Sequence, residues 1–152
     1  MRQFSVRSHR ITWLCLALGG LPALGAGGPD IRVREIDTRT GRGMPGMPVW
    51  LYLGDPMKAS TPRLEATTDG GGTITFHLTS PVPDQIFIYD EVLGAFRACS
   101  HGTFRTEEIM RVGVVGADTC DRSGKLRKKF RAQPGEVILF VRKLRWWEGI
   151  QT

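Results

Sequence analysis

The sequence predicts an all-β fold: an antiparallel, seven-stranded Greek-key sandwich with one short helix. Three observations lead to this prediction. Apolar and polar residues alternate with a period of two in several short segments, Gly and Pro residues separate those segments, and only one stretch has helical character. Five to seven short strands separated by turns are typical of an antiparallel sandwich rather than of alternating strands and helices.

The first 26 residues have the layout of a secretory signal. Three arginines precede residues 11–26, which are apolar and free of charge, and a Gly-Pro break follows. This apolar stretch is shorter than the roughly 20 residues that span a bilayer comfortably. We therefore expect cleavage after Ala26 and export to a periplasm or to the exterior. An uncleaved signal that anchors the chain in the membrane is the alternative.

Residues 27–152 are long enough for one domain and too short for two. Removal of the arginine-bearing leader lowers the net charge from +6 to +3, so much of the formal charge belongs to the leader. Basic residues concentrate in residues 121–152, which indicates a modestly cationic face rather than a nucleic-acid footprint. The chain contains no Asn, which excludes N-glycosylation and a Lys–Asn isopeptide crosslink, whereas a Lys–Asp crosslink stays open.

The alternation of residue types defines the expected strands in chain order. In residues 31–36, Ile31 and Val33 fall on one face and the intervening arginines on the other. Residues 49–53 are apolar on both faces, as in a central strand, and residues 54–72 read as a long polar connection. Strands are expected at 31–36, 49–53, 73–78, 85–90 and 136–142, with weaker candidates at 112–115 and 126–130.

One helix of at most two turns is expected after residue 105. Thr106 can cap its start, Glu107 and Glu108 lie at the positive end of its dipole, and Gly113 can end it. This helix falls between Cys99 and Cys120, within a segment that separates the expected strands. We therefore place the helix in an insertion closed by those two cysteines.

A disulfide between Cys99 and Cys120 is the expected state of these thiols, because two leftover cysteines in an oxidising compartment usually pair. Free thiols are one alternative. Zinc would require four ligands, and only His101 lies nearby in the sequence. A nucleophilic cysteine would need a base and an orienting partner, which neither the spacing nor the composition supplies.

Residues 31–90 contain an ordered series of strands and turns. A strand is followed by an Asp and a Thr-Gly turn, a Pro-led second strand, and then a Thr-Asp pair, a Gly turn and an aromatic-bearing strand. The residues at these positions are Asp37, Thr40, Gly41, Pro48, Thr68, Asp69, Gly72 and Phe76. With this series, residues 31–90 resemble the carboxypeptidase regulatory-like, transthyretin-related sandwich domain. The resemblance implies a prealbumin-like, seven-stranded module over residues 27–152, similar to domains of exported bacterial proteins, that binds, spaces or stabilises and brings no catalytic residue.

Other residues that could carry chemistry have simpler interpretations. His77 lies on the polar face of an alternating strand and His101 in a turn, so neither indicates acid–base catalysis. Asp69 and the glycines that follow it form a turn, because calcium and phosphate loops need further ligands that are missing. We therefore expect no catalytic residue, no metal and no cofactor.

The C-terminal region mixes cations with aromatic residues and supplies the candidate binding residues. These candidates are Arg142, Lys143, Arg145, Trp146 and Trp147. They suit an anionic envelope polymer, a membrane surface or, through stacking of the tryptophans, a sugar. The simpler interpretation is that Leu126 and Phe130 pack inward with solvated basic neighbours and that the tryptophans cover the end of the sandwich.

The leading functional hypothesis is an exported, non-catalytic module with a binding or structural role in the cell envelope. The sequence thus predicts that the chain is not an enzyme. We expect an envelope or extracellular partner of unknown identity, no binding of nucleic acid, and no membrane span after cleavage. An accessory domain for carbohydrate or anionic polymer is the alternative. A small envelope hydrolase is the rival from another class, and a zinc carboxypeptidase would need a catalytic domain for which the chain has no room.

Overall fold

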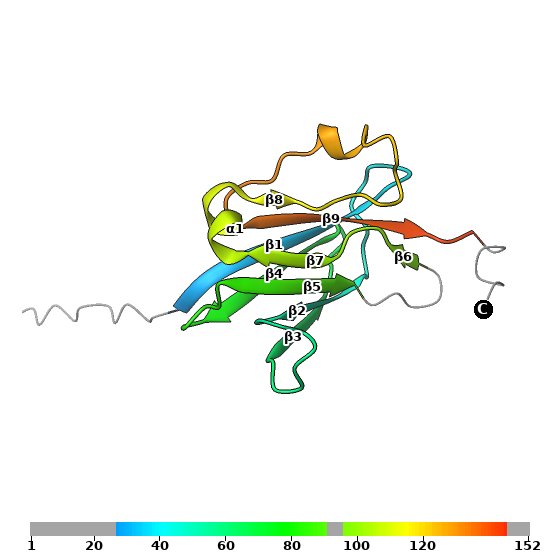
Figure 1. The fold of residues 1–152 in the computed structure, drawn as a ribbon. Coiled ribbons are helices and arrows are strands. Elements are labelled where there is room, and N and C mark those ends of the chain that lie inside the picture. The colour runs from blue at the N-terminus through cyan, green and yellow to red at the C-terminus, as the bar shows by residue number, and fades with distance from the viewer. Residues whose placement is uncertain (1–26, 91–95, 146–152) are drawn as a thin grey trace, which may run out of the picture.

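The structure is a computed structural model that describes residues 27–90 and 96–145. The chain forms two sheets that pack face to face, with the segment between β8 and β9 running across the outside of one of them (Figure 1). The elements are β1 (Gly27–Asp37), β2 (Pro48–Tyr52), β3 (Arg63–Thr67), β4 (Thr73–Thr79), β5 (Gln85–Asp90), β6 (Phe96–Ala98), β7 (Gly102–Arg105), α1 (Thr106–Val112), β8 (Val114–Val115), the 3₁₀ helix η1 (Arg127–Lys129) and β9 (Glu136–Lys143).

The larger sheet has the strand order β4-β1-β9-β6, with β8 also pairing with β9, and the smaller sheet has the order β3-β2-β5-β7. β9 runs parallel to β1 and to β8, whereas the other strand pairs are antiparallel. The prediction of a purely antiparallel sandwich is therefore wrong. The long connection after β8 returns across the larger sheet, so that β9 enters in the same direction as β1.

The β-sandwich itself is confirmed, and its core lies between the two sheets. Alternation along each strand sends every second side chain inward, as it does for Ile31 and Val33 of β1. The buried core residues are Ile31, Val33, Val49, Leu51, Phe76, Leu78, Ile86, Ile88, Ile109, Val137 and Leu139. Burying a side chain of this size stabilises the fold by roughly 1.5–3 kcal/mol, so this interior supplies most of the driving force for folding.

The segment between β8 and β9, residues 116–135, forms a third layer on the outer face of the larger sheet. All residues of β9 from Glu136 to Val141 are buried, because the core covers one face of this strand and the third layer covers the other. The residues of this outer cluster are Ile36, Cys99, Ile138 and Phe140, with Val115, Cys120, Leu126, Phe130 and Ala132 packed against them. The expectation that Leu126 and Phe130 pack inward is confirmed.

Two loops pass very close to one another beside β1. A Cβ atom on Gly43 or on Gly72 would collide with the backbone of the other loop, and Gly72 has φ = +76°. The Asp69 carboxylate holds the second loop by accepting hydrogen bonds from the backbone N–H groups of Gly71 (2.8 Å) and Thr73 (2.9 Å). The interpretation of Asp69 and its glycines as a turn therefore agrees with the structure.

Several expectations about individual elements are corrected. Nine strands occur in the described residues, so the seven-strand Greek-key arrangement is not confirmed. The connection expected at 54–72 contains the edge strand β3, and the weak strand candidate at 126–130 is the helix η1 instead. The short helix is confirmed, but Thr106 is its first residue, and its hydroxyl donates to the Pro83 carbonyl oxygen (2.6 Å) rather than capping the helix.

The predicted leader, residues 1–26, lies outside the described residues. Within the part of the chain that the structure describes, no helix has the length and apolar character needed to cross a membrane.

Candidate functional site

Positive charge converges on the outer face of the larger sheet, at the start of β9. A pocket of about 430 Å³ lies there between two strands and the third layer. We call it the Arg pocket, and its lining residues are Arg32, Arg34, Thr73, Arg131, Gln133 and Glu136. Arg32 and Arg34 point outward because Ile31 and Val33 occupy the inward positions of β1.

Strand register brings the remaining polar groups of the Arg pocket together. Glu136 is the register partner of Arg32 on β9, and Thr73 is the register partner of Arg34 on β4. Arg131 and Gln133 reach the pocket from the segment between η1 and β9. The site thus depends on residues that lie about 100 positions apart in the sequence, which only the parallel pairing of β1 with β9 unites.

The charges in the Arg pocket do not balance. One Glu136 carboxylate oxygen lies 3.5 Å from Arg32 Nε and 3.3 Å from Arg34 Nε, and the other accepts a hydrogen bond from the backbone N–H of Gln133 (2.9 Å). A single carboxylate therefore contacts two guanidinium groups, and Arg131 adds a third guanidinium to the lining of the same pocket. The Arg32 and Arg34 side chains are 44% and 32% exposed, so both can still donate to a ligand.

Aromatic packing holds one of these arginines in place. The Arg34 guanidinium lies over the ring of Phe130, 5.9 Å from its centroid. Phe130 in turn packs edge-on against the buried Phe140, with 5.7 Å between the ring centroids. Cation–π contacts of this kind orient a guanidinium without consuming its hydrogen-bond donors. Arg34 is therefore preorganised for a planar anion.

A second hollow of about 430 Å³ continues the positive surface beyond Arg131. It lies between α1, β8 and η1, and Lys128 contributes a further cation to it. We call residues 121–133 the basic layer, whose cations are Arg122, Lys125, Arg127, Lys128, Lys129 and Arg131. Arg131 lines both hollows and so links the Arg pocket to the basic layer, and the second hollow also contains one acidic side chain, Glu108.

Internal hydrogen bonds fix the shape of the basic layer. Arg127 donates to the carbonyl oxygens of Gly116 (3.0 Å) and Val115 (3.2 Å), which ties η1 to β8. The acidic member, Asp121, accepts hydrogen bonds from the hydroxyl of Ser123 (2.6 Å) and the backbone N–H of Leu126 (3.1 Å). These two hydrogen bonds lower the pKa of Asp121, because they stabilise its ionised carboxylate. The carboxylate in turn holds the turn before η1.

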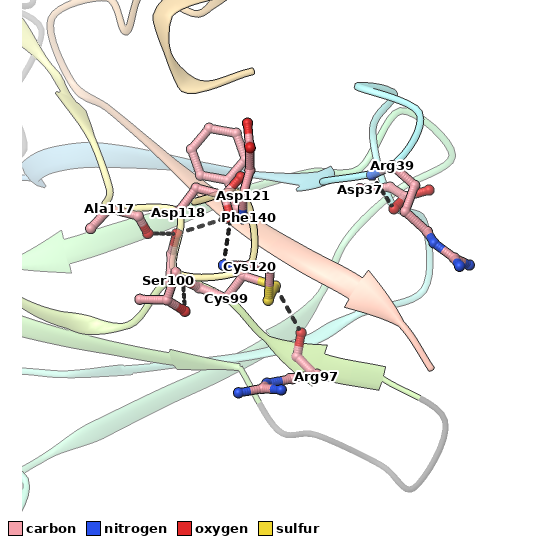
Figure 2. Close-up of a disulfide and its surroundings, with 11 residues drawn as sticks. Asp37, Arg39, Arg97, Cys99, Ser100, Ala117, Asp118, Cys120, Asp121 and Phe140 are labelled. Atoms are coloured by element: carbon pink, nitrogen blue, oxygen red, sulfur yellow. Dashed lines mark hydrogen bonds between the residues drawn. A yellow bond between two sulfur atoms is a disulfide. The ribbon is translucent and has the colours of Figure 1, made fainter. Parts of the chain in front are cut away.

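The prediction of a disulfide between Cys99 and Cys120 is confirmed, and Figure 2 shows it beside β9. The two Cα atoms lie 5.3 Å apart, within the usual range. Thr119 donates to the Cys99 carbonyl oxygen through both its backbone N–H and its hydroxyl (2.9 Å each). These hydrogen bonds join the same two ends of the loop as the disulfide does. Asp118 is near both sulfur atoms, but the sulfurs bond to each other.

Ser100 joins the disulfide-closed segment to β9. Its hydroxyl donates to the Ala117 carbonyl oxygen and accepts a hydrogen bond from the backbone N–H of Phe140 (3.1 Å). Figure 2 shows these contacts around the disulfide. The third layer, and with it the basic layer, is therefore attached to the larger sheet by a covalent bond and by buried hydrogen bonds.

The binding residues predicted from the sequence lie elsewhere. Arg142 and Lys143 are at the far end of β9 from Glu136, and Arg145 follows that strand. Trp146 and Trp147 lie outside the described residues, so their role as ligand-binding residues stays a prediction. The sequence analysis missed Arg32, Arg34 and Arg131. Alternation had placed the first two on one face, but nothing in the sequence linked that face to Arg131.

The two histidines of the described chain lie at the surface. His77 Nδ1 is 2.7 Å from a carboxylate oxygen of Asp30, with both side chains largely exposed. His101 is also exposed, in the connection between β6 and β7.

A larger hollow, of about 640 Å³, lies at the start of α1. Its lining includes Asp84 and Glu107 as well as Arg105, whose guanidinium is 3.9 Å from the Glu107 carboxylate. This hollow therefore contains side chains of both charges. The Arg pocket is the stronger candidate for a site because its charges have one dominant sign.

The two packed sheets place the chain in the broad class of β-sandwich proteins. No protein-family model matches it, and no curated protein sequence matches it either. The resemblance to carboxypeptidase regulatory-like domains is therefore unconfirmed.

Solved structures with a similar fold include the full-length major pilin SpaD from Corynebacterium diphtheriae, at 11% identity over 76% of this chain, with a TM-score of 0.46. The chain spans 30% of the pilin's length. An intradiol ring-cleavage dioxygenase from Tetranychus urticae is 12% identical over 77% of this chain and 81% of its own, with a TM-score of 0.46. Catechol 1,2-dioxygenase from Acinetobacter sp. ADP1 is 14% identical over 85% and 56%, with a TM-score of 0.42.

These neighbours correct one prediction from the sequence. Two of the three are dioxygenases, so structures similar to this chain include enzymes, and the prediction that the chain is not an enzyme is contradicted. At these identities the likeness concerns the fold alone, and the enzyme status of the chain is not established.

Proposed function

We propose that the chain is an exported β-sandwich module of the cell envelope that binds a polymer bearing phosphate or carboxylate groups. The binding surface is the Arg pocket together with the basic layer. The observation that carries the proposal is the excess of positive charge in the Arg pocket, whose lining holds the guanidinium groups of Arg32, Arg34 and Arg131 but the single carboxylate of Glu136.

The chemistry of the guanidinium group favours these ligands. Its planar fork of N–H donors matches the two oxygens of a carboxylate or a phosphate and can bind them in a bidentate manner. A polymer is favoured over a single small anion because the exposed Lys125 and Lys129 extend the cationic region beyond the pocket. Repeated weak contacts along one chain raise the overall affinity well above that of each contact.

Two features support export. Disulfides persist in oxidising compartments and are rare in the cytosol, and the Cys99–Cys120 bond fixes the chain directly before the basic layer. The composition of residues 1–26 fits a secretory signal. A module fixed by a disulfide suits the periplasm or the exterior, where anionic polymers also occur.

As part of the same proposal, we assign the sandwich to the carboxypeptidase regulatory-like type. Turn contacts support this assignment. The Asp37 carboxylate accepts hydrogen bonds from the backbone N–H of Arg39 (3.0 Å) and the hydroxyl of Thr40 (2.9 Å), and Gly41 follows with φ = +69°. These residues occupy the Asp and Thr-Gly positions on which the resemblance rests.

The experiment is a calorimetric titration of the disulfide-bonded domain, residues 27–152, with inorganic polyphosphate and, separately, with polygalacturonate. Dextran serves as a neutral polymer. We expect binding to at least one polyanion, weakened by added salt because exposed charges are screened. A cation near an anionic surface contributes about 1 kcal/mol, so the double variant Lys128→Gln/Arg131→Gln should bind at least about tenfold more weakly.

The matched control removes the same number of charges from the opposite side of the molecule. This control is the double variant Lys58→Gln/Arg63→Gln. Lys58 lies in the loop between β2 and β3, and Arg63 lies on β3 at the edge of the smaller sheet. This variant should keep the wild-type affinity. Equal losses in both double variants would show that net charge alone drives binding, and no binding of either polyanion would overturn the proposed function.

A further inference from the structure

A pair of carboxyl groups lies in the core between the two sheets. Alternation places Glu35 on the inward face of β1, in phase with Ile31 and Val33, and Asp90 on the inward face of β5, in phase with Ile86 and Ile88. Both side chains have an exposed fraction of 0%. Acidic side chains are almost never buried to this extent without a cationic partner.

The two carboxyl groups have each other as neighbours and no cation. None of their four oxygens has a hydrogen-bond partner among the described residues. Each carboxyl is close enough to the other to influence its pKa, and no Lys, Arg or His contributes to either pKa. The pair is therefore isolated in the core and can satisfy its polar atoms only internally.

The elements around the pair present apolar side chains to it. The register partners are Leu139 of β9 for Glu35 and Val49 of β2 for Asp90. The other inward-facing side chains of β1, β2, β4, β5 and β9 are Ile31, Val33, Leu51, Ile74, Phe76, Leu78, Ile86, Ile88, Val137 and Val141. Among the described residues, the other buried acidic side chain is Glu136, which lines the Arg pocket on the outer face of the larger sheet.

Physical chemistry constrains the protonation of such a pair. Two ionised carboxylates cannot share an apolar site, because each would lose its hydration and repel the other. A protonated carboxyl can instead donate its O–H to the second carboxyl. Burial, followed by the charge of Asp90, raises the pKa of Glu35 well above its ordinary value, and burial raises the pKa of Asp90 to about 6.

We propose that Glu35 and Asp90 form a proton-holding latch between the two sheets, which closes in acid and loosens the sandwich as its protons are lost at higher pH. The step is a simple dissociation: a proton leaves a carboxyl O–H to solvent, and the hydrogen bond between the two strands is replaced by repulsion between carboxylates. This latch is independent of the anion-binding surface, which lies on the other face of the larger sheet.

The sign of the pH dependence follows from proton linkage. The folded chain holds protons that the unfolded chain releases near pH 4, so it binds more protons between pH 4 and the raised pKa values. Stability from the latch is complete below pH 4 and is lost as the pH rises through about 6 and beyond. The folding equilibrium constant falls about tenfold per pH unit for each retained proton within this window.

The test is urea unfolding of the disulfide-bonded domain at pH 5 and pH 8, followed by tryptophan fluorescence. The wild type should unfold at a lower urea concentration at pH 8. The double variant Glu35→Gln/Asp90→Asn replaces the acids with neutral groups of the same size that can still hydrogen-bond to each other. It should lose most of the difference between the two pH values. Glu65→Gln, on the exposed edge strand β3, is the matched control and should keep the wild-type difference.

A second measurement uses the wild type alone and applies even if the double variant does not fold. In a ¹³C NMR titration of the side-chain carboxyl groups, Glu35 and Asp90 should titrate at or above about pH 6. Ordinary titration of both groups near pH 4 would overturn the proposal. A wild-type midpoint that is the same at pH 5 and pH 8 would also overturn it, as would a folded double variant that keeps the full difference.

Discussion

At the scale of single residues, one buried hydroxyl joins two loops. Thr68 is 5% exposed, donates a hydrogen bond to the Met44 carbonyl oxygen (2.8 Å) and accepts one from the backbone N–H of Met47 (2.9 Å). The loop before β2 and the loop after β3 therefore meet at a single side chain. The contact thus gives Thr68 a physical role. From the sequence, this residue was identified only as part of a family resemblance.

Replacing Thr68 with Val keeps the shape of the side chain and removes both hydrogen bonds. The buried N–H of Met47 then has no partner, which costs about 1–3 kcal/mol in the free energy of unfolding. Urea unfolding measures this loss. The matched control is Thr67→Val, at the exposed neighbouring position of β3. If both variants unfold at the same urea concentration, the buried hydroxyl does not have the role assigned to it.

The sequence contained part of the information on the buried acids. The alternation that predicted the strand at 31–36 also places Glu35 inward, and the strand at 85–90 places Asp90 inward in the same way. Each acid alone looks like the polar end of a strand. Only the packing of the two sheets shows that the acids meet, because that contact joins strands from different sheets.

At the scale of elements, strands with a strong alternating pattern were predictable and edge strands were not. The strand at 85–90 was predicted with its observed limits, and the strand at 136–142 differs from β9 by one residue. β3, β6 and β7 were missed because they are short and lack a run of inward-facing apolar residues. Whether such a short edge segment forms a strand depends more on its pairing with the neighbouring strand than on the local preference of its residues.

The third layer depends on its disulfide for stability. Closing a loop of about 22 residues restricts the unfolded chain and stabilises the fold by roughly 3 kcal/mol. The double variant Cys99→Ala/Cys120→Ala should therefore unfold at a lower urea concentration than the wild type. Addition of a reductant should lower the wild-type midpoint to a similar value and leave the variant unchanged. A variant as stable as the oxidised wild type would contradict this role.

At the scale of the whole molecule, the third layer connects stability with function. Its Phe130 packs against Phe140 and helps to bury the outer face of β9, and its Arg131 lines the Arg pocket together with the arginines of β1. The sequence predicted the two-sheet body and the disulfide. It did not predict that the segment between β8 and β9 would cover the larger sheet, since that depends on the parallel pairing of β9 with β1.

The most direct test of the proposed binding surface is an NMR titration of the domain with inorganic polyphosphate, in which backbone amides and arginine side-chain N–H groups are followed. The largest shift changes should occur at Arg32, Arg34, Lys128 and Arg131, with small changes on the smaller sheet. Changes confined to residues 142–145, or no change at the Arg pocket, would contradict a binding site on the outer face of the larger sheet.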